Sequence, residues 1–180
     1  MKSKLWIIGL IVSILILTTL ETPSFALSSK SNLVTLRGLG GVGVLVEKLP
    51  AEIEKEGLTT NQLQIEVELK LRAAGIKVFT REDSPNVPGE PHLYINININ
   101  IAKTESDVYP YSIDAMLIQQ VYLIRHPQPT VYAVTWSTGG VGSISKEFVG
   151  QLRNSVEDIV DIFIKAYLSE NPIEKEETNK

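Results

Sequence analysis

The sequence predicts an α+β fold, a two-layer sandwich in which two helices cover one face of a mostly antiparallel sheet. Three observations predict this architecture. Residues 94–101 (YINININI) alternate isoleucine with asparagine, as a strand with one buried face does. Apolar residues between 148 and 167 recur at helical spacing, and short turn-like segments connect the last three predicted strands. The expected order of elements is β-α-β-β-β-β-α.

Length and composition exclude several classes of protein. The chain has 180 residues, a net charge of −4 and no cysteine. Its length fits one domain, which we place at 27–168. The charge lacks the concentrated basic face of nucleic-acid-binding proteins, so we expect no nucleic-acid partner. A chain without cysteine has no disulfide, no thiolate metal site and no thiol nucleophile.

The N-terminal segment 1–26 has the pattern of an export signal. Lys2 and Lys4 precede an uncharged apolar run over 5–20. Small residues occupy the two positions that a signal peptidase reads, the second of which is Ala26. These features predict a signal peptide cleaved after Ala26, and therefore a periplasmic or secreted protein. The alternative is a retained N-terminal anchor, in which case this segment alone would contact the membrane. A lipid anchor would need a cysteine after the cleavage site, and the chain has none.

The N-terminal half contains one conflict between strand and helix signals. The first predicted elements are a strand at 42–49, a helical turn at 50–56 ending at Gly57, and a helix at 59–75. Residues 63–71 alternate apolar and polar side chains, which by itself is typical of a strand. Thr59 and Gln62 fit a capping box, and Gly75 stands where a left-handed helix end belongs. We therefore interpret 59–75 as a helix.

This helix is apolar on two faces. At 100° per residue, Leu63, Val67 and Leu71 fall on one side. Ile65 and Leu69 fall on nearly the opposite side. The interpretation we favour is that 50–56 or a chain terminus covers this second face; the alternative is an exposed stripe that binds a partner.

The rest of the domain reads as a meander followed by a long helix. The predicted strands lie at 76–80, 94–101, 111–125 and 130–137, and the last three form an antiparallel meander. A helix follows, with Ser145 as its N-cap. Its apolar stripe, which should cover the sheet, consists of Phe148, Leu152, Val156, Ile159, Phe163 and Tyr167. Residues 169–180 are polar and charged and are expected to form a disordered acidic tail.

The segment 57–78, GLTTNQLQIEVELKLRAAGIKV, carries a family resemblance. Together with the glycine-rich strand before it and the meander and helix after it, it resembles an exported bacterial protein family of unassigned function. The layout is also similar to that of outer-membrane assembly lipoproteins, including the one that helps insert lipopolysaccharide. These resemblances imply a sandwich of two helices and four strands in the cell envelope. They transfer no functional residue, and this chain lacks the anchoring cysteine of those lipoproteins.

Motifs of catalysis are missing from the sequence. It contains no G-x-S-x-G elbow, no H-E-x-x-H and no calcium loop. The glycine-rich stretch 139–146 (GGVGSISK) suggests a phosphate cradle, but Ile144 stands where a P-loop needs its second glycine. We favour a flexible connection leading into the last helix over an anion site at its start.

The two histidines are expected to lie apart. A hairpin turn near 106–107 would place Val121 or Tyr122 opposite His92. His126 would then lie roughly 15 Å away at about 3.3 Å per residue, which is too far for one metal ion. We therefore predict two surface histidines and no metal site.

The face of strand 94–101 that carries asparagine is the most unusual feature, because asparagine is disfavoured in strands. Asn96, Asn98 and Asn100, with Tyr122 from the next strand, offer amide donors and acceptors beside an aromatic ring. The sequence leaves open whether the even-numbered residues of the next strand share this face. A polar outer face with Met116, Ile118 and Tyr122 as scattered exposed apolar residues is the interpretation we favour, and a binding face is the alternative.

Two hypotheses about function follow. The first is a non-enzymatic envelope module, with no cofactor, that binds an envelope protein or a surface polymer through the asparagine face or through Ile65 and Leu69. The second is a small-ligand carrier or a carboxylate-based enzyme. Its acid–base residues would be Glu47, Asp107 or Asp114 acting with Tyr109 or Tyr111. We favour the first hypothesis.

Overall fold

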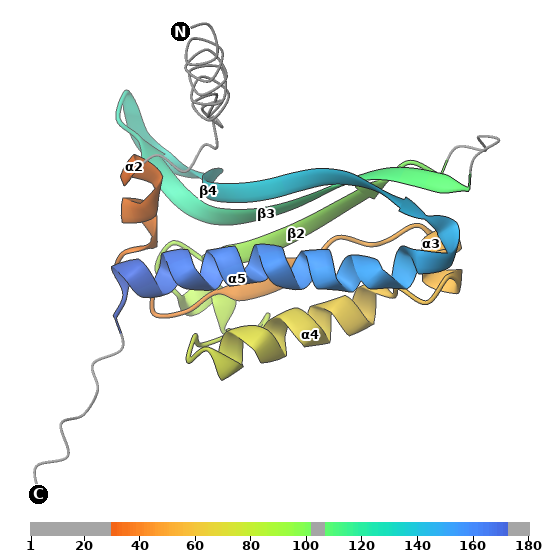
Figure 1. The fold of residues 1–180 in the computed structure, drawn as a ribbon. Coiled ribbons are helices and arrows are strands. Elements are labelled where there is room, and N and C mark those ends of the chain that lie inside the picture. The colour runs from red at the N-terminus through yellow and green to blue at the C-terminus, as the bar shows by residue number, and fades with distance from the viewer. Residues whose placement is uncertain (1–29, 102–106, 173–180) are drawn as a thin grey trace, which may run out of the picture.

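The computed structural model describes residues 30–101 and 107–172 and has a four-stranded sheet in the order β1-β2-β3-β4. Two long helices cover one face of this sheet, so the predicted α+β sandwich is confirmed (Figure 1). The elements are α2 (Lys30–Leu33), η1 (Val34–Leu36), β1 (Gly43–Val46), α3 (Ala51–Lys55), α4 (Thr60–Ala73), η2 (Ser84–Asn86), β2 (His92–Ile99), β3 (Val108–Leu123), β4 (His126–Ser145), η3 (Lys146–Gln151) and α5 (Leu152–Glu170). The predicted signal segment with Ala26 lies outside the described residues.

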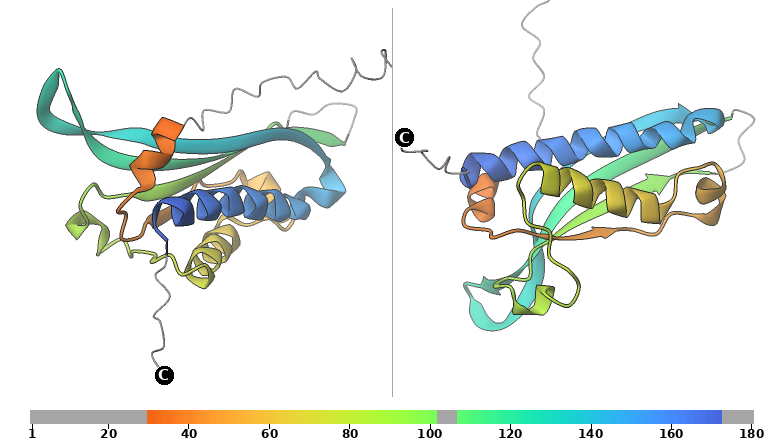
Figure 2. Two further views of the ribbon diagram at one scale, coloured as in Figure 1. Left: turned by 60° about the vertical axis from the view of Figure 1, so that its left-hand side comes forward. Right: turned by 90° about the horizontal axis from the view of Figure 1, so that it is seen from below.

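The sheet is antiparallel except at one edge. β1 runs parallel to β2, and β2, β3 and β4 form the predicted meander. Odd-numbered residues of β2 and β3 face the helices and are buried, as Ile95 and Ala115 illustrate. Seen from below, α4 and α5 lie side by side under the sheet, and the β3–β4 hairpin reaches beyond them (Figure 2). The hydrophobic core therefore fills the space between this layer of helices and the sheet.

The segment predicted as a strand at 76–80 is shorter than expected. It makes one parallel bridge, in which Val78 faces Val42. The Val42 N–H donates to the Lys77 oxygen at 3.0 Å, and the Phe79 N–H donates to the Val42 oxygen at 2.9 Å. The pairing stops there because a turn begins, in which the Thr80 hydroxyl donates to Asp83 at 2.8 Å.

Helix α4 confirms the helical interpretation of 59–75. The Thr59 hydroxyl oxygen accepts from the Gln62 N–H, and Gly75 ends the helix with φ +79°. The side with Leu63, Val67 and Leu71 is buried. The opposite side is not covered as we had favoured: Ile65 is 49% and Leu69 58% exposed. Segment α3 instead inserts its own Ile53 into the core.

Strand β4 is much longer than the predicted strand at 130–137, because the glycine-rich stretch 139–145 continues it. The reason is steric. A Cβ on Gly139 would lie 2.3 Å from the Asp114 carboxylate, and one on Gly142 would lie 2.7 Å from the Tyr111 ring. Glycine lets these β3 side chains lie against β4. The stretch is strand, so it is neither the flexible connection nor the phosphate cradle considered above.

The last helix begins later than predicted. The Lys146 N–H donates to the Asp107 oxygen at 2.8 Å, which extends the ladder past Ser145. A 3-10 turn follows and α5 begins at Leu152, so Ser145 does not cap this helix and Phe148 is left exposed. The rest of the predicted stripe is buried. The helix continues past residue 168 to Glu170, and residues 173–180 of the expected tail lie outside the described part of the chain.

Candidate functional site

The face of the sheet that points away from the helices, here called the open face, carries the asparagines of β2. Asn96 faces Asp114 of β3, and Asn98 faces Ser112. Directly opposed residues of an antiparallel pair share one face of the sheet. The even-numbered residues of β3 therefore lie on the asparagine side, which settles the question that the sequence left open.

A chain of polar contacts runs along this face, here called the polar row: Tyr94, Glu47, Asn96 and Asn98. The Glu47 carboxylate accepts from the Asn96 amide, and the Asn96 oxygen accepts from the Asn98 amide. A hydrogen bond to the Glu47 carboxylate raises the pKa of the Tyr94 phenol. The asparagines thus satisfy one another and Glu47, which explains how a strand tolerates them. Asn100 lies just beyond β2, where its N–H donates to the Pro110 oxygen at 2.9 Å.

Beside the polar row lies an apolar band: Leu45, Tyr94, Met116, Ile118 and Val134. Leu45 faces Tyr94, Tyr94 faces Met116, and Ile118 faces Val134, so the band crosses all four strands. Leu45 is 48% and Val134 52% exposed. Contiguous apolar side chains on a face that none of the described helices covers are typical of an interaction site. From the sequence we favoured a polar outer face with scattered apolar residues; the strand register places Met116 and Ile118 in one band with Leu45 and Val134.

Two exposed tyrosines extend the band toward the β3–β4 hairpin. Tyr132 faces Gln120, and its hydroxyl donates to the Glu90 carboxylate at 2.7 Å. The Gln120 amide donates to the same carboxylate at 2.7 Å, which holds the 81–91 segment against the sheet. Tyr122, which the sequence singled out, lies further along β3 and is exposed.

Sequence reasoning missed Leu45, Tyr132 and Val134. The reason is a bulge. The register shifts between Leu117 and Ile118, which face Trp136 and Val134, so one extra residue of β4 stands between them. Strict alternation would put Val134 on the buried side with Trp136. No residue type in 130–137 marks the bulge. Leu45 is exposed because it faces Tyr94 on the open face, whereas Val46, the next residue, faces Ile95 and is buried.

The acid–base residues of the enzyme hypothesis do not converge. Glu47 and Asp114 lie on the open face, on either side of Asn96. Tyr109 and Tyr111 pack against the core on the other face of the sheet. Asp107 lies just before β3, where its backbone oxygen bonds to η3. Among the described residues, no cluster of His, Asp or Glu has the composition of a metal site.

The two histidines lie apart, as expected, but His92 is not a plain surface residue. Its Nε2 lies 3.0 Å from the Ser84 hydroxyl, and its Nδ1 lies 2.7 Å from the Glu90 backbone oxygen. Ser84 is buried, so this pair fastens the loop before β2 rather than presenting a nucleophile. His92 faces Ile118, whereas His126 faces Leu123 at the hairpin.

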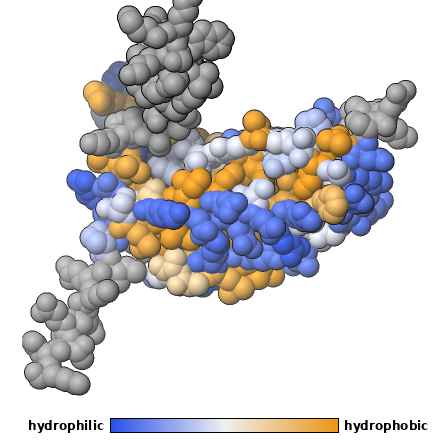
Figure 3. Space-filling model, in the orientation of Figure 1, coloured by the Kyte–Doolittle hydropathy of each residue, from blue (hydrophilic) through white to orange (hydrophobic). Residues whose placement is uncertain are grey.

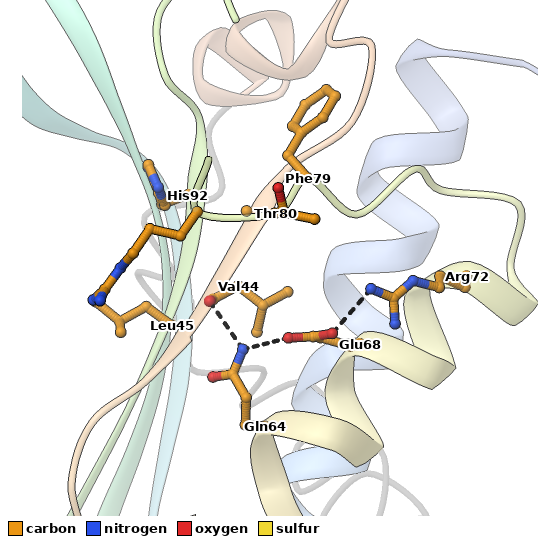
Figure 4. Close-up of a pocket in the computed structure, with 10 residues that line it drawn as sticks. Val44, Leu45, Gln64, Glu68, Arg72, Phe79, Thr80 and His92 are labelled. Atoms are coloured by element: carbon orange, nitrogen blue, oxygen red, sulfur yellow. Dashed lines mark hydrogen bonds and ion pairs between the residues drawn. The ribbon is translucent and has the colours of Figure 1, made fainter. Parts of the chain in front are cut away.

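A cleft of 470 Å³ lies between the outer edge of β1, helix α4 and the segment after the Val78 bridge. Figure 4 shows the Gln64 side chain reaching from α4 to this edge. Its amide donates to the Val44 oxygen at 3.0 Å and to Glu68 at 2.6 Å, and Arg72 pairs with the same Glu68. These side chains bind one another and the backbone of β1, so they block this edge of the sheet. They do not converge as free polar groups on a ligand in the cleft.

The exposed face of α4 is the second surface that the sequence proposed. Figure 3 shows apolar residues at the lower edge of the molecule, below the hydrophilic side chains of α5. Ile65 and Leu69 form this stripe. Ion pairs border it, because Lys70 pairs with Asp161 at 3.0 Å and Arg72 with Glu68. The stripe has two apolar residues, Ile65 and Leu69, whereas the apolar band of the open face has five.

Comparison with known proteins shows no family. No family model matches the sequence, and no curated protein matches it. A solved structure described as a minor lipoprotein from Acinetobacter baumannii matches with a TM-score of 0.29 and 8% identity. The match covers 75% of this chain and 93% of that one. A likeness this loose supports no argument about function, so the unassigned family suggested by the segment 57–78 stays a prediction.

Among the helices that the structure describes, none is long and apolar enough to span a membrane.

Proposed function

We propose that this protein is an exported, non-enzymatic binding module of the cell envelope and that a partner protein docks on its open face. Export is the expectation from segment 1–26, and the absence of catalytic motifs is a property of the sequence. The observation that carries the proposal is the apolar band beside the polar row.

The composition of the open face supports a protein partner. Protein interfaces combine a central apolar patch with a polar rim that supplies hydrogen bonds. Leu45 and Val134 supply exposed aliphatic surface, and Tyr132 adds an aromatic ring. The polar row supplies amide and carboxylate groups along one border. A surface polymer of sugars would use the aromatic rings and the amides but would gain little from the aliphatic side chains.

The experiment is site-specific photo-crosslinking in the protein's own host. A photoreactive residue replaces Val134 on the open face in one variant and Leu69 on α4 in the other, both exposed positions. We expect a discrete protein adduct from position 134 and none from position 69. An adduct from position 69 alone would move the partner to α4. No protein adduct at either position would overturn the proposal.

A pair of matched double variants tests which side chains carry the affinity. Leu45→Ser with Val134→Ser removes two exposed aliphatic side chains from the open face. Ile65→Ser with Leu69→Ser removes two from α4 at similar exposure. Both variants should keep the wild-type melting temperature, and only the first should lose the adduct at a photoreactive residue placed at Tyr122. Equal loss in both variants would contradict docking on the open face.

A further inference from the structure

The two outer edges of the sheet, at β1 and at β4, differ in how many of their backbone groups are blocked by other parts of the chain. The outer edge of β1 is closed: Val42 bridges to Val78, and the Gln64 amide bonds the Val44 oxygen and the Val46 N–H. The Thr60 hydroxyl accepts from the Leu49 N–H just beyond it at 2.9 Å. Unpaired strand edges invite pairing with other chains, and monomeric proteins usually block them in such ways.

The outer edge of β4 has little comparable protection. The stretch 130–145 contains no charged residue and no proline, the two kinds of residue that most often block an edge. Within the described part of the chain, the only side-chain hydrogen bond to this edge is that of the Thr35 hydroxyl to the Thr135 oxygen at 3.2 Å. Beyond Thr135, no side chain in 30–101 or 107–172 forms such a hydrogen bond to the nine-residue segment 137–145.

The β3–β4 ladder shows which backbone groups of this segment do not bond to β3. The Lys146 N–H bonds to β3, and bonding residues alternate along an antiparallel strand. Even-numbered residues therefore bond to β3, and the odd-numbered ones direct N–H and C=O away from the sheet. Those residues are Ser137, Gly139, Val141, Ser143 and Ser145. Val141, at their centre, is 87% exposed.

We propose that a second copy of this chain pairs with this edge in antiparallel orientation, about a two-fold axis at Val141. The sequence of the segment, STGGVGSIS, is nearly symmetric about that residue. Serine stands at 137 and 145, a β-branched residue at 138 and 144, and glycine at 140 and 142. A two-fold axis brings these equivalent positions together, so small residues meet small ones and no like charges oppose each other.

Pairing in this register would satisfy the unpaired groups, since each facing pair of outward residues exchanges two hydrogen bonds. The two sheets would form one continuous eight-stranded sheet. The open faces of both copies would lie on the same side of it. The inference does not rest on the proposed partner, because the pairing uses backbone groups of the β4 edge, whereas the partner would contact side chains of the open face.

Helix α5 supplies a second contact below the edge. Arg153 and Asp161 of α5 pair with Glu66 and Lys70 of α4, which defines the flank of α5 that faces α4. At 100° per residue, Ile162 lies on the opposite flank, toward the β4 side of the sheet. It is an exposed apolar residue. Edge-to-edge pairing would bring this flank of one copy toward that of the other.

The first test uses the fact that the chain contains no cysteine. Val141→Cys places a single thiol at the axis, where facing Cα atoms of a hydrogen-bonded pair lie about 5.5 Å apart, within disulfide range. Leu69→Cys is the control, because it is exposed on α4 and far from the edge. Under mild oxidation at micromolar concentration, the full-length chain with Val141→Cys should form a covalent dimer, and Leu69→Cys should stay monomeric. Equal dimer formation by both variants, or none by either, would overturn the pairing.

The second test measures mass in solution by light scattering. The unmodified protein should have twice the mass of one chain. Val141→Lys sets two like charges face to face and should yield the monomer, whereas Val141→Thr keeps a β-branched strand residue and should stay dimeric. A monomeric unmodified protein would overturn the proposal.

Discussion

The side-chain oxygen of Gln64 accepts a hydrogen bond from the Val46 N–H at 3.0 Å, as the backbone of a neighbouring strand would. The same amide donates to the Val44 oxygen, so one side chain satisfies two backbone groups of an edge strand. A helix residue thus holds α4 in register with β1. This relationship explains why the helix lies where it does and leads to the first prediction.

Replacing Gln64 with alanine should destabilise the protein by about 1–3 kcal/mol, because two partly buried hydrogen bonds to the backbone are lost at about 0.5–1.5 kcal/mol each. Asn61→Ala removes an exposed amide from the same helix and should change stability by less than about 0.5 kcal/mol. Urea unfolding of both variants measures the difference. Equal midpoints would show that Gln64 does not close the edge.

The glycines of β4 should respond unequally to alanine. A Cβ on Gly139 would meet Asp114 and the Ile113 oxygen, at 2.3 and 2.8 Å, whereas a Cβ on Gly140 would meet nothing within 4 Å. Gly139→Ala should therefore cost about 1–3 kcal/mol through forced backbone movement. Gly140→Ala should be neutral or slightly stabilising, because alanine has less conformational freedom to lose. Thermal unfolding of the two variants checks this, and a loss of the same size in both would contradict the steric explanation.

Much of this fold could be predicted because its elements carry local signals. The caps of α4, at Thr59 and Gly75, outweighed the alternation that favoured a strand. The stripe of α5 also follows from spacing alone. The glycine stretch of β4 was misinterpreted, because glycine disfavours strands in general and only the Asp114 and Tyr111 side chains on the neighbouring strand explain it.

The register of β2 against β3 shows a second limit. A turn near 106–107 would set Val121 or Tyr122 opposite His92, but Ile118 faces it. With Val121 opposite His92, Asp114 would point toward the helices, because a shift by an odd number of residues moves every side chain to the other face. With Tyr122 there, Asp114 would stay on the asparagine side. Burial of Ile113 on one face and the only partly buried Asp114 on the other are consistent with the observed register. Distant side chains, rather than the turn, therefore determine which groups form the open face.

The polar row leads to a prediction about how the stability contributed by Tyr94 depends on pH. Its phenol is neutral when protonated, and the hydrogen bond to Glu47 raises its pKa above the usual 10.0. The bond therefore stabilises the fold below about pH 10, and this stabilisation is lost as pH rises through the folded-state pKa. Glu47→Gln should lower the pKa of Tyr94, measured by the ring NMR signals, and Glu52→Gln on α3 should not. An unchanged value in Glu47→Gln would remove Glu47 from the row.

The last prediction compares the loss of stability caused by substitutions at two neighbouring residues of β2 that point to opposite faces of the sheet. Asn98 is exposed on the open face and contributes one hydrogen bond to Asn96, so Asn98→Leu should change stability by no more than about 1 kcal/mol. Ile97 is buried among core residues on the opposite face, and Ile97→Ala should cost about 2–5 kcal/mol. Denaturant unfolding distinguishes the two. A large loss in Asn98→Leu would mean that the amides are structurally required and that the row is part of the folded core. A small loss, together with an altered yield of the adduct at position 134, would show that the open face can change its binding chemistry without changing its fold, which is the property expected of a docking surface.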